Sequence, residues 1–141
     1  MYRLNSRALL LAVAVVVVGA MSACSNDALN VPTPYTPCPC TDGFAGTLSK
    51  NGAFSHTFTT SNLGAVTAAL VSLAPNTSQI VGLQLGVWNG VSCTAASSTD
   101  TATSGSSITL NASSAGTLCV RLYDVGFISE PVLYQLQVTH P

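Results

Sequence analysis

From residue 44 onward, apolar and polar residues alternate with a period of two in a series of short runs. In the clearest run, Ile80–Trp88, one set of side chains is predicted to be buried and the other to face outward. The buried set is Val81, Leu83, Leu85 and Val87, and the outward set is Gly82, Gln84, Gly86 and Trp88. Successive side chains of a β-strand point to opposite faces, so this pattern predicts strands with one buried face. With no helical period after the N-terminal segment, the sequence predicts an all-β domain.

Turn signals such as Asn51-Gly52, Pro75-Asn76 and Asn89-Gly90 separate the runs. The stretch 94–107 is rich in Ser, Thr and Ala, and it is predicted to be a loop with room for one irregular edge strand. Seven or eight short strands at this spacing predict an antiparallel β-sandwich. The predicted strands are 44–48, 54–59, 65–73, 80–88, 107–112, 116–123 and 132–139. The predicted core contains Val66, Leu70, Leu83, Leu85, Leu118, Val120, Leu136 and Val138.

The N-terminus has the features of a bacterial export signal. Arg3 and Arg7 precede an apolar run, 8–20, which is shorter than the roughly 20 residues that a transmembrane helix needs. Met21-Ser22-Ala23-Cys24 resembles a lipobox, the tetrapeptide at which a cysteine is lipidated and becomes the mature N-terminus. Cleavage at the small residues Val18-Gly19-Ala20 is the alternative, and it would release a freely secreted product.

Lipidation of Cys24 would anchor the protein in the bacterial cell envelope, because several acyl chains hold a protein firmly to a bilayer. Ser25 follows the cysteine in place of Asp, and by analogy with enteric bacteria this predicts the outer membrane. The domain would then lie in the periplasm or at the cell surface. The predicted organisation is a lipoprotein signal peptide at 1–23, a Pro-rich tether at 24–41 and a β-sandwich domain at 42–141.

The chain contains five cysteines, and an odd number in an exported protein requires an explanation. Lipidation of Cys24 removes one thiol and leaves four that can pair. Cys38 and Cys40 are candidates for a second disulfide, either with each other or with an intermolecular partner, and a bond between two residues so close in sequence would be strained. Metal binding by this pair is not predicted, because two thiolates are half of a tetrahedral zinc site and no nearby His completes it.

Cys93 and Cys119 are the cysteines predicted to form a structural disulfide, since export favours oxidation. Closing a loop of about 26 residues would stabilise the domain by roughly 3.5 kcal/mol in the chain-entropy description. Cys119 alternates with the predicted core residues Leu118 and Val120, so its side chain should face outward. The bridge is therefore expected on the outer face of the sandwich, near Trp88.

The order of these features resembles the bacterial pre-peptidase C-terminal domain family and its jelly-roll-like relatives, over residues 41–141. This resemblance implies a jelly-roll-like sandwich without catalytic activity. Family members are usually appended to secreted proteases and other exported proteins and are not themselves catalytic. The present chain carries no protease. The matching stretches are Phe44-Ala45-Gly46-Thr47-Leu48, 54–58, 65–75, Leu83-Gln84-Leu85, 116–124 and Tyr134-Gln135-Leu136-Gln137-Val138.

Charged residues are scarce, with four Lys or Arg and five Asp or Glu in the whole chain. Two of the four basic residues, Arg3 and Arg7, belong to the predicted signal. Nucleic-acid binding is excluded on this ground, because it requires clustered Lys and Arg to neutralise phosphates. A polybasic patch for membrane binding is absent as well.

Neither catalytic residues nor a cofactor are predicted. His56 lies within a predicted strand and His140 near the C-terminus, and no Gly-x-Ser-x-Gly motif provides a nucleophile. Calcium-binding relatives of the resembled family direct attention to the oxygen-bearing side chains. These are scattered and follow no EF-hand spacing, so no metal site is predicted. They are Asn89, Asp100, Asp124 and Glu130.

Trp88 and Tyr123, with Phe127, are candidates for stacking against a sugar or a peptide. The sequence thus predicts a non-enzymatic lipoprotein of the cell envelope that consists of a binding or structural module. Its predicted partner is the membrane, which it contacts through the lipid anchor. Its ligand class stays open between an extracellular polysaccharide and a protein or peptide. The alternative function is that of an accessory or carbohydrate- or peptide-binding subunit of a separately encoded secreted hydrolase.

Overall fold

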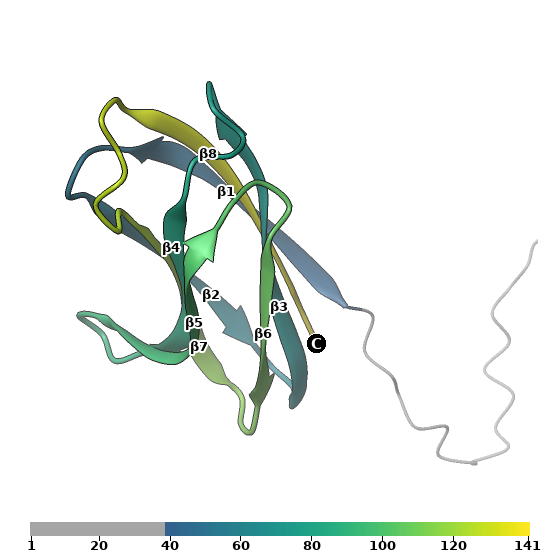
Figure 1. Cartoon of the computed structure of the whole chain (residues 1–141). Helices are drawn as coiled ribbons and strands as arrows, with labels where there is room; N and C mark the ends of the chain where they lie inside the picture. The colour runs from purple at the N-terminus through teal and green to yellow at the C-terminus, as the bar shows by residue number, and fades with distance from the viewer. Residues whose placement is uncertain (1–38) are drawn as a thin grey trace, which may run out of the picture. The chain divides into compact units, whose positions relative to one another are not determined.

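A computed structural model describes residues 39–141. The predicted signal peptide, the lipidation site at Cys24 and most of the tether, including Cys38, lie outside the described residues. Within residues 39–141 the chain forms eight strands and no helix, and thus no helix that could cross a membrane (Figure 1). The strands are β1 (Cys40–Leu48), β2 (Ala53–Thr60), β3 (Gly64–Ala74), β4 (Val81–Trp88), β5 (Cys93–Ala102), β6 (Ser107–Ala112), β7 (Gly116–Tyr123) and β8 (Val132–His140).

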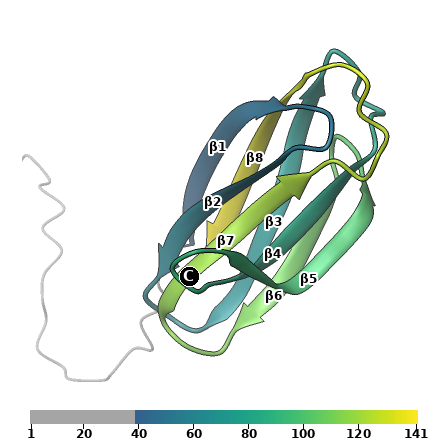
Figure 2. The same ribbon diagram turned by 90° about the vertical axis from the view of Figure 1, so that its left-hand side faces the viewer.

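The strands form two four-stranded sheets that pack face to face (Figures 1 and 2). Sheet A has the order β1-β8-β3-β6 and sheet B the order β2-β7-β4-β5, and every pairing is antiparallel. The chain crosses from one sheet to the other at each connection except that between β4 and β5, which is a hairpin within sheet B. This is the strand order of a jelly roll, and the predicted antiparallel, jelly-roll-like β-sandwich is confirmed.

The core lies between the two sheets and contains all eight predicted residues, each at most 5% exposed. Strand β8 shows the cause most plainly, because its side chains alternate between buried and exposed along nearly its whole length. Further buried side chains complete the core, among them Val81, which the alternation also predicted to be buried. They are Leu48, Phe58, Leu73, Val81, Leu122, Ile128, Val132 and Tyr134.

Strand β4 departs from the predicted alternation. Val87, predicted to lie on the buried face, is 51% exposed, because it lies near the end of β4. The three residues before it that were predicted to face outward are buried, because other parts of the chain cover the outer side of β4. Those residues are Gly82, Gln84 and Gly86.

The Ser/Thr/Ala-rich stretch contains the edge strand β5, so the prediction of a loop over all of 94–107 was wrong. Only 103–106 forms the turn to β6. The alternative of one irregular edge strand is confirmed, since the pairing of β5 with β4 shifts register twice. Backbone pairing with β4 and the covalent link at Cys93 hold this strand, and weak side-chain propensity does not prevent it.

Candidate functional site

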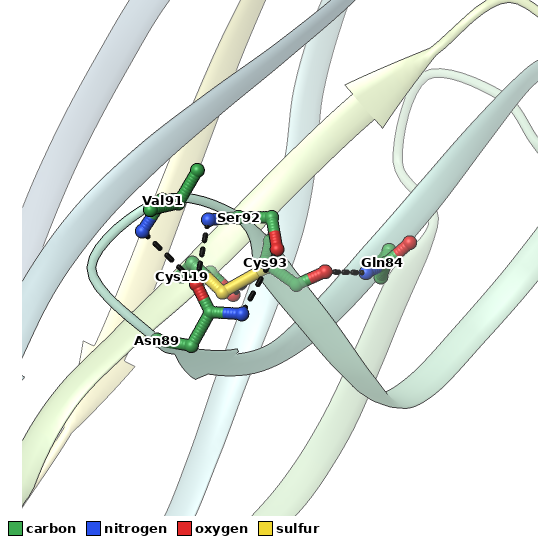
Figure 3. The surroundings of a disulfide bond; sticks show 6 residues. All are labelled: Gln84, Asn89, Val91, Ser92, Cys93 and Cys119. Carbon is green, nitrogen blue, oxygen red and sulfur yellow. Dashed lines mark hydrogen bonds between the residues drawn. A yellow bond between two sulfur atoms is a disulfide. The ribbon is translucent and has the colours of Figure 1, made fainter.

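The hairpin between β4 and β5 stands out from the sandwich on the side of sheet B (Figures 1 and 2). Its first β5 residue, Cys93, is joined by a disulfide to Cys119 of β7, with the two Cα atoms 5.7 Å apart. The predicted bridge is thus present in the structure. Cys119 is fully buried although it points away from the core, because the hairpin lies over it (Figure 3).

Two residues of β4 let the hairpin lie this close to the sheet. A Cβ atom at Gly86 would be 1.9 Å from the backbone oxygen of Thr94, so only glycine fits there. The Gln84 side-chain amide donates a hydrogen bond of 2.9 Å to the carbonyl of Cys93 (Figure 3). The start of β5 is therefore fixed to sheet B by a covalent bond, a hydrogen bond and direct backbone packing.

Asn89 holds the turn of the hairpin in one conformation. Its Oδ1 accepts hydrogen bonds from the backbone NH groups of Val91 and Ser92, and its Nδ2 donates to the Ser92 hydroxyl (Figure 3). An Asn side chain that bonds to the backbone two and three residues later is a common way to stabilise a turn. Asn89 therefore serves the turn, and its amide oxygen is occupied.

A hollow of about 360 Å³ lies beside this hairpin on the outer face of sheet B. One side is formed by the hairpin and the other by the edge strand β2 and by Arg121 of β7. Trp88, a predicted contact residue, contributes its half-buried side chain to the hollow. The complete lining is Ala53, Ser55, Trp88, Val91, Ser92, Cys93 and Arg121.

Tyr123, the other predicted contact residue, does not line this hollow. Its ring lies over Gly82, and its hydroxyl donates a hydrogen bond to a carboxylate oxygen of Asp100. That hydrogen bond, with partial burial and the negative charge of Asp100, raises the pKa of Tyr123 above its ordinary value. The structure thus places Tyr123 and Trp88 at different ends of β4.

Arg121 is the functional candidate that sequence reasoning missed. Its guanidinium lies 5.4 Å from the centre of the Tyr123 ring, in a cation–π contact. Within residues 39–141 the one ion pair joins His140 and Asp42, so no carboxylate within salt-bridge distance neutralises Arg121. A signal was present in the sequence, because Arg121 alternates with core residues and is one of two basic residues after the signal.

Both histidines are engaged in packing between strands. A hydrogen bond of 2.8 Å joins His56 Nε2 and the Tyr134 hydroxyl, and the Phe44 ring stacks on the imidazole. Burial lowers the pKa of His56 and raises the pKa of Tyr134 from their ordinary values. His140 Nε2 lies 3.1 Å from Asp42 Oδ2, which joins the ends of β8 and β1.

Asp124 organises the loop between β7 and β8. Its Oδ1 accepts hydrogen bonds from three successive backbone NH groups, those of residues 126–128, and its Oδ2 accepts one from Asn51. Partial desolvation would raise the pKa of this carboxyl, but the backbone hydrogen bonds outweigh it and lower the pKa below its ordinary value. Phe127, held on this loop, is 64% exposed.

The remaining predicted residues are dispersed. Cys40 is exposed at the start of β1, and its predicted partner Cys38 lies outside the described residues. Asp100, Asp124 and Glu130 do not converge. In the part of the chain that the structure describes, no three His, Cys, Asp or Glu side chains are grouped so that they could hold a metal ion.

Two solved structures share this fold. The Yersinia pseudotuberculosis-derived mitogen is 17% identical, with a TM-score of 0.56, and the match covers 74% of this chain and 88% of the mitogen. PliG of Aeromonas hydrophila, a periplasmic inhibitor of g-type lysozyme, is 11% identical, with a TM-score of 0.54, and the match covers 73% and 88%. No protein-family model and no curated protein sequence matches the chain. At these identities the likeness concerns the fold alone.

Proposed function

We propose that this protein is a non-catalytic binding module of the bacterial cell envelope, anchored through a lipid on Cys24. The observation that carries the binding role is the hollow beside the hairpin, which Trp88 and the unneutralised Arg121 both line on a surface fixed by a disulfide. The histidines and Asp124 are engaged in holding the fold together. The solved relative PliG, a periplasmic inhibitor, supports an envelope protein that acts by binding.

Lipid attachment is tested by labelling cells with a fatty-acid probe. The protein with Cys24 is expected to incorporate the label, and Cys24→Ser is expected to lose it, because the thiol is the attachment point. Equal labelling of the two proteins, or a mature N-terminus that begins at Met21, would contradict the anchor. The outer-membrane location is tested by separating inner and outer membranes by density.

Binding is tested with the mature chain carrying Cys24→Ser, which stays in solution. Purified envelope and extracellular polysaccharides and purified secreted hydrolases, including a g-type lysozyme, are titrated against it by calorimetry. At least one is expected to bind, and Trp88→Ala is expected to weaken that binding at least tenfold by removing the indole from the hollow. Retention of full affinity in Trp88→Ala would show that the binding site lies elsewhere on the domain.

A second candidate function is that of an accessory subunit for a separately encoded secreted hydrolase. It is favoured by the loops at the end of the sandwich opposite the paired residues Cys40 and His140. There the Gln79 side chain donates a hydrogen bond to the carbonyl of Phe127, and Asn51 is bonded to Asp124. These bonds hold the backbone at Phe127 in place and leave its ring exposed, and an exposed aromatic ring on a fixed loop is suited to anchor a protein interface.

The two candidates are separated by comparing Phe127→Ala with Trp88→Ala. If a protein partner such as g-type lysozyme binds through the loops, Phe127→Ala weakens its binding and Trp88→Ala leaves it unchanged. Binding through the hollow gives the reverse result.

A further inference from the structure

We propose that the hollow beside the hairpin binds a saccharide that carries a carboxylate, such as a uronic acid unit of an extracellular polysaccharide. The sugar ring would pack on Trp88, and its carboxylate would be bound by Arg121. This inference rests on the proposed binding function and specifies its ligand.

The first observation is the position of Trp88. Trp88 is the last residue of β4. Its backbone pairs with that of Cys93, which the disulfide fixes to β7. A sugar ring presents a face of C–H groups, which packs favourably on the face of a large aromatic ring. Because the disulfide and the Asn89 turn hold the hairpin in place, little conformational freedom is lost on binding.

The second observation is the charge of Arg121. A guanidinium binds a carboxylate through two parallel hydrogen bonds, and this geometry distinguishes a carboxylate from a neutral hydroxyl group. Asp100, which accepts the hydrogen bond of Tyr123, forms no ion pair with Arg121. The guanidinium contacts the Tyr123 ring, 5.4 Å from its centre, but no carboxylate neutralises its charge, and this charge would bind the carboxylate of a ligand in the hollow.

The third observation is the remaining lining. Ser55 places a hydroxyl in the hollow that makes no hydrogen bond within residues 39–141, and Ser92 uses its hydroxyl to accept from Asn89. These hydroxyls are suited to the hydroxyl groups of a sugar. The volume of about 360 Å³ lies at the lower end of the range of small-ligand sites, so it fits one or two sugar units. An acidic peptide would form fewer hydrogen bonds with these hydroxyls and would pack less completely on the indole.

The test uses the mature chain with Cys24→Ser and measures binding by calorimetry at low ionic strength. The probes are polygalacturonate, the same polymer with its carboxyl groups methyl-esterified, neutral dextran and poly-glutamate. Polygalacturonate is expected to bind and its methyl ester to bind at least tenfold more weakly. Alginate and hyaluronan serve as further uronate probes in case the linkage or the epimer matters.

The chain offers a matched control, since Lys50 and Arg121 are its two basic residues after the signal. Arg121→Gln is expected to reduce uronate binding at least tenfold, whereas Lys50→Gln, in the β1–β2 turn, should change it less than twofold. Arg121→Lys keeps the charge and should retain part of the affinity. Thermal unfolding of each variant shows whether the domain is still folded.

Several results would overturn the inference. Equal loss in Arg121→Gln and Lys50→Gln would show that binding depends only on net charge. Binding of neutral dextran that requires Trp88 but not Arg121 would leave the proposed function in place and refute the acidic ligand. Binding of poly-glutamate in preference to every uronate polymer would assign the hollow to an acidic peptide. Absence of binding to all uronate probes would also refute it.

Discussion

The outer faces of the two sheets differ in what covers them. On sheet A the outward side chains of β8 are exposed to solvent, as strict alternation requires. On sheet B the central strand β4 is buried on both faces over most of its length, because the β4–β5 hairpin and the Tyr123 ring lie over it. Both sheets bury the same kind of apolar face in the core. Only sheet B acquires a second layer on its outer side.

The chemistry of the two faces differs in the same way. The depressions on sheet A are lined by uncharged side chains, which range from the small Ala45 and Thr47 to the aromatic Tyr134. The hollow on sheet B is lined by Trp88 and Arg121, an aromatic and a charged residue. The hairpin forms one wall of that hollow, and strands β2 and β7 form the other. The comparison therefore indicates that the hairpin is what distinguishes the outer face of sheet B as a candidate site.

The largest expected effect comes from removing the covalent link of this second layer. Replacing Cys93 and Cys119 together by Ala should lower the free energy of unfolding by about 3.5 kcal/mol, since the bridge closes a loop with a sequence separation of 26. Urea unfolding followed by the fluorescence of Trp88, the chain's one tryptophan, measures this loss. A loss below about 1 kcal/mol would show that the hairpin holds its place without the bridge.

The next effect concerns the glycines on the two outer faces. Gly86→Ala should cost about 2–3 kcal/mol, because the new methyl group would overlap the Thr94 carbonyl and force the hairpin away from sheet B. Gly43→Ala on sheet A is the matched control, since nothing lies within 4 Å of its added Cβ. That variant should be neutral or gain about 0.4–1 kcal/mol through reduced freedom of the unfolded chain. Similar losses of stability in both variants would contradict the conclusion that the outer face of sheet B is covered and that of sheet A is open.

The sequence was sufficient to predict the buried core and the exposed outer positions of β8 in sheet A. It was insufficient to predict the second layer that covers the outer face of sheet B. Alternation identified Leu70, Leu136 and Val138 as buried, because one packed face per strand is a local property of the chain. Burial of Gly82 and Gly86 depends on which segment folds over them, which is a tertiary property. The two glycines at outward positions were nevertheless a signal, because glycine within a strand often marks a close backbone approach.

The candidate site was predictable in part for the same reason. Trp88 and the Cys93–Cys119 bridge followed from alternation and from export. The role of Arg121 did not follow, because Trp88 and Arg121 line one hollow only through the tertiary placement of the hairpin, and an ideal flat sheet gives no reason to prefer Arg121 over Tyr123. Strand β5, the second strand of the hairpin, was predicted mainly as a loop because it is rich in Ser, Thr and Ala.

A smaller effect is expected where the two sheets are joined, at the hydrogen bond between His56 of β2 and Tyr134 of β8. Burial lowers the pKa of His56 in the folded protein, so the unfolded chain binds the proton more readily. Stability should therefore be full above the ordinary His pKa of about 6.5 and should decline as the pH falls through it toward the lower folded value. Equilibrium unfolding in urea at a series of pH values measures this decline.

His56→Gln provides the control, because it removes the titrating group and leaves the ion pair of His140 with Asp42 unchanged. The difference in stability between wild type and this variant should shrink as the pH falls below about 6.5. A difference that is constant with pH would show that His56 contributes by packing alone.

The smallest effect is expected on the open face of sheet A. Leu133 is 59% exposed on β8, so Leu133→Ser should change the free energy of unfolding by no more than about 0.5 kcal/mol. The measurement is made on the mature chain with Cys24→Ser, and is repeated on the lipidated protein reconstituted into lipid vesicles. The expected result is the same small change in both forms. A loss of more than about 1 kcal/mol in the lipidated form alone would mean that this face is covered at the membrane. In that case the contrast between the two sheets would hold only for the protein in solution.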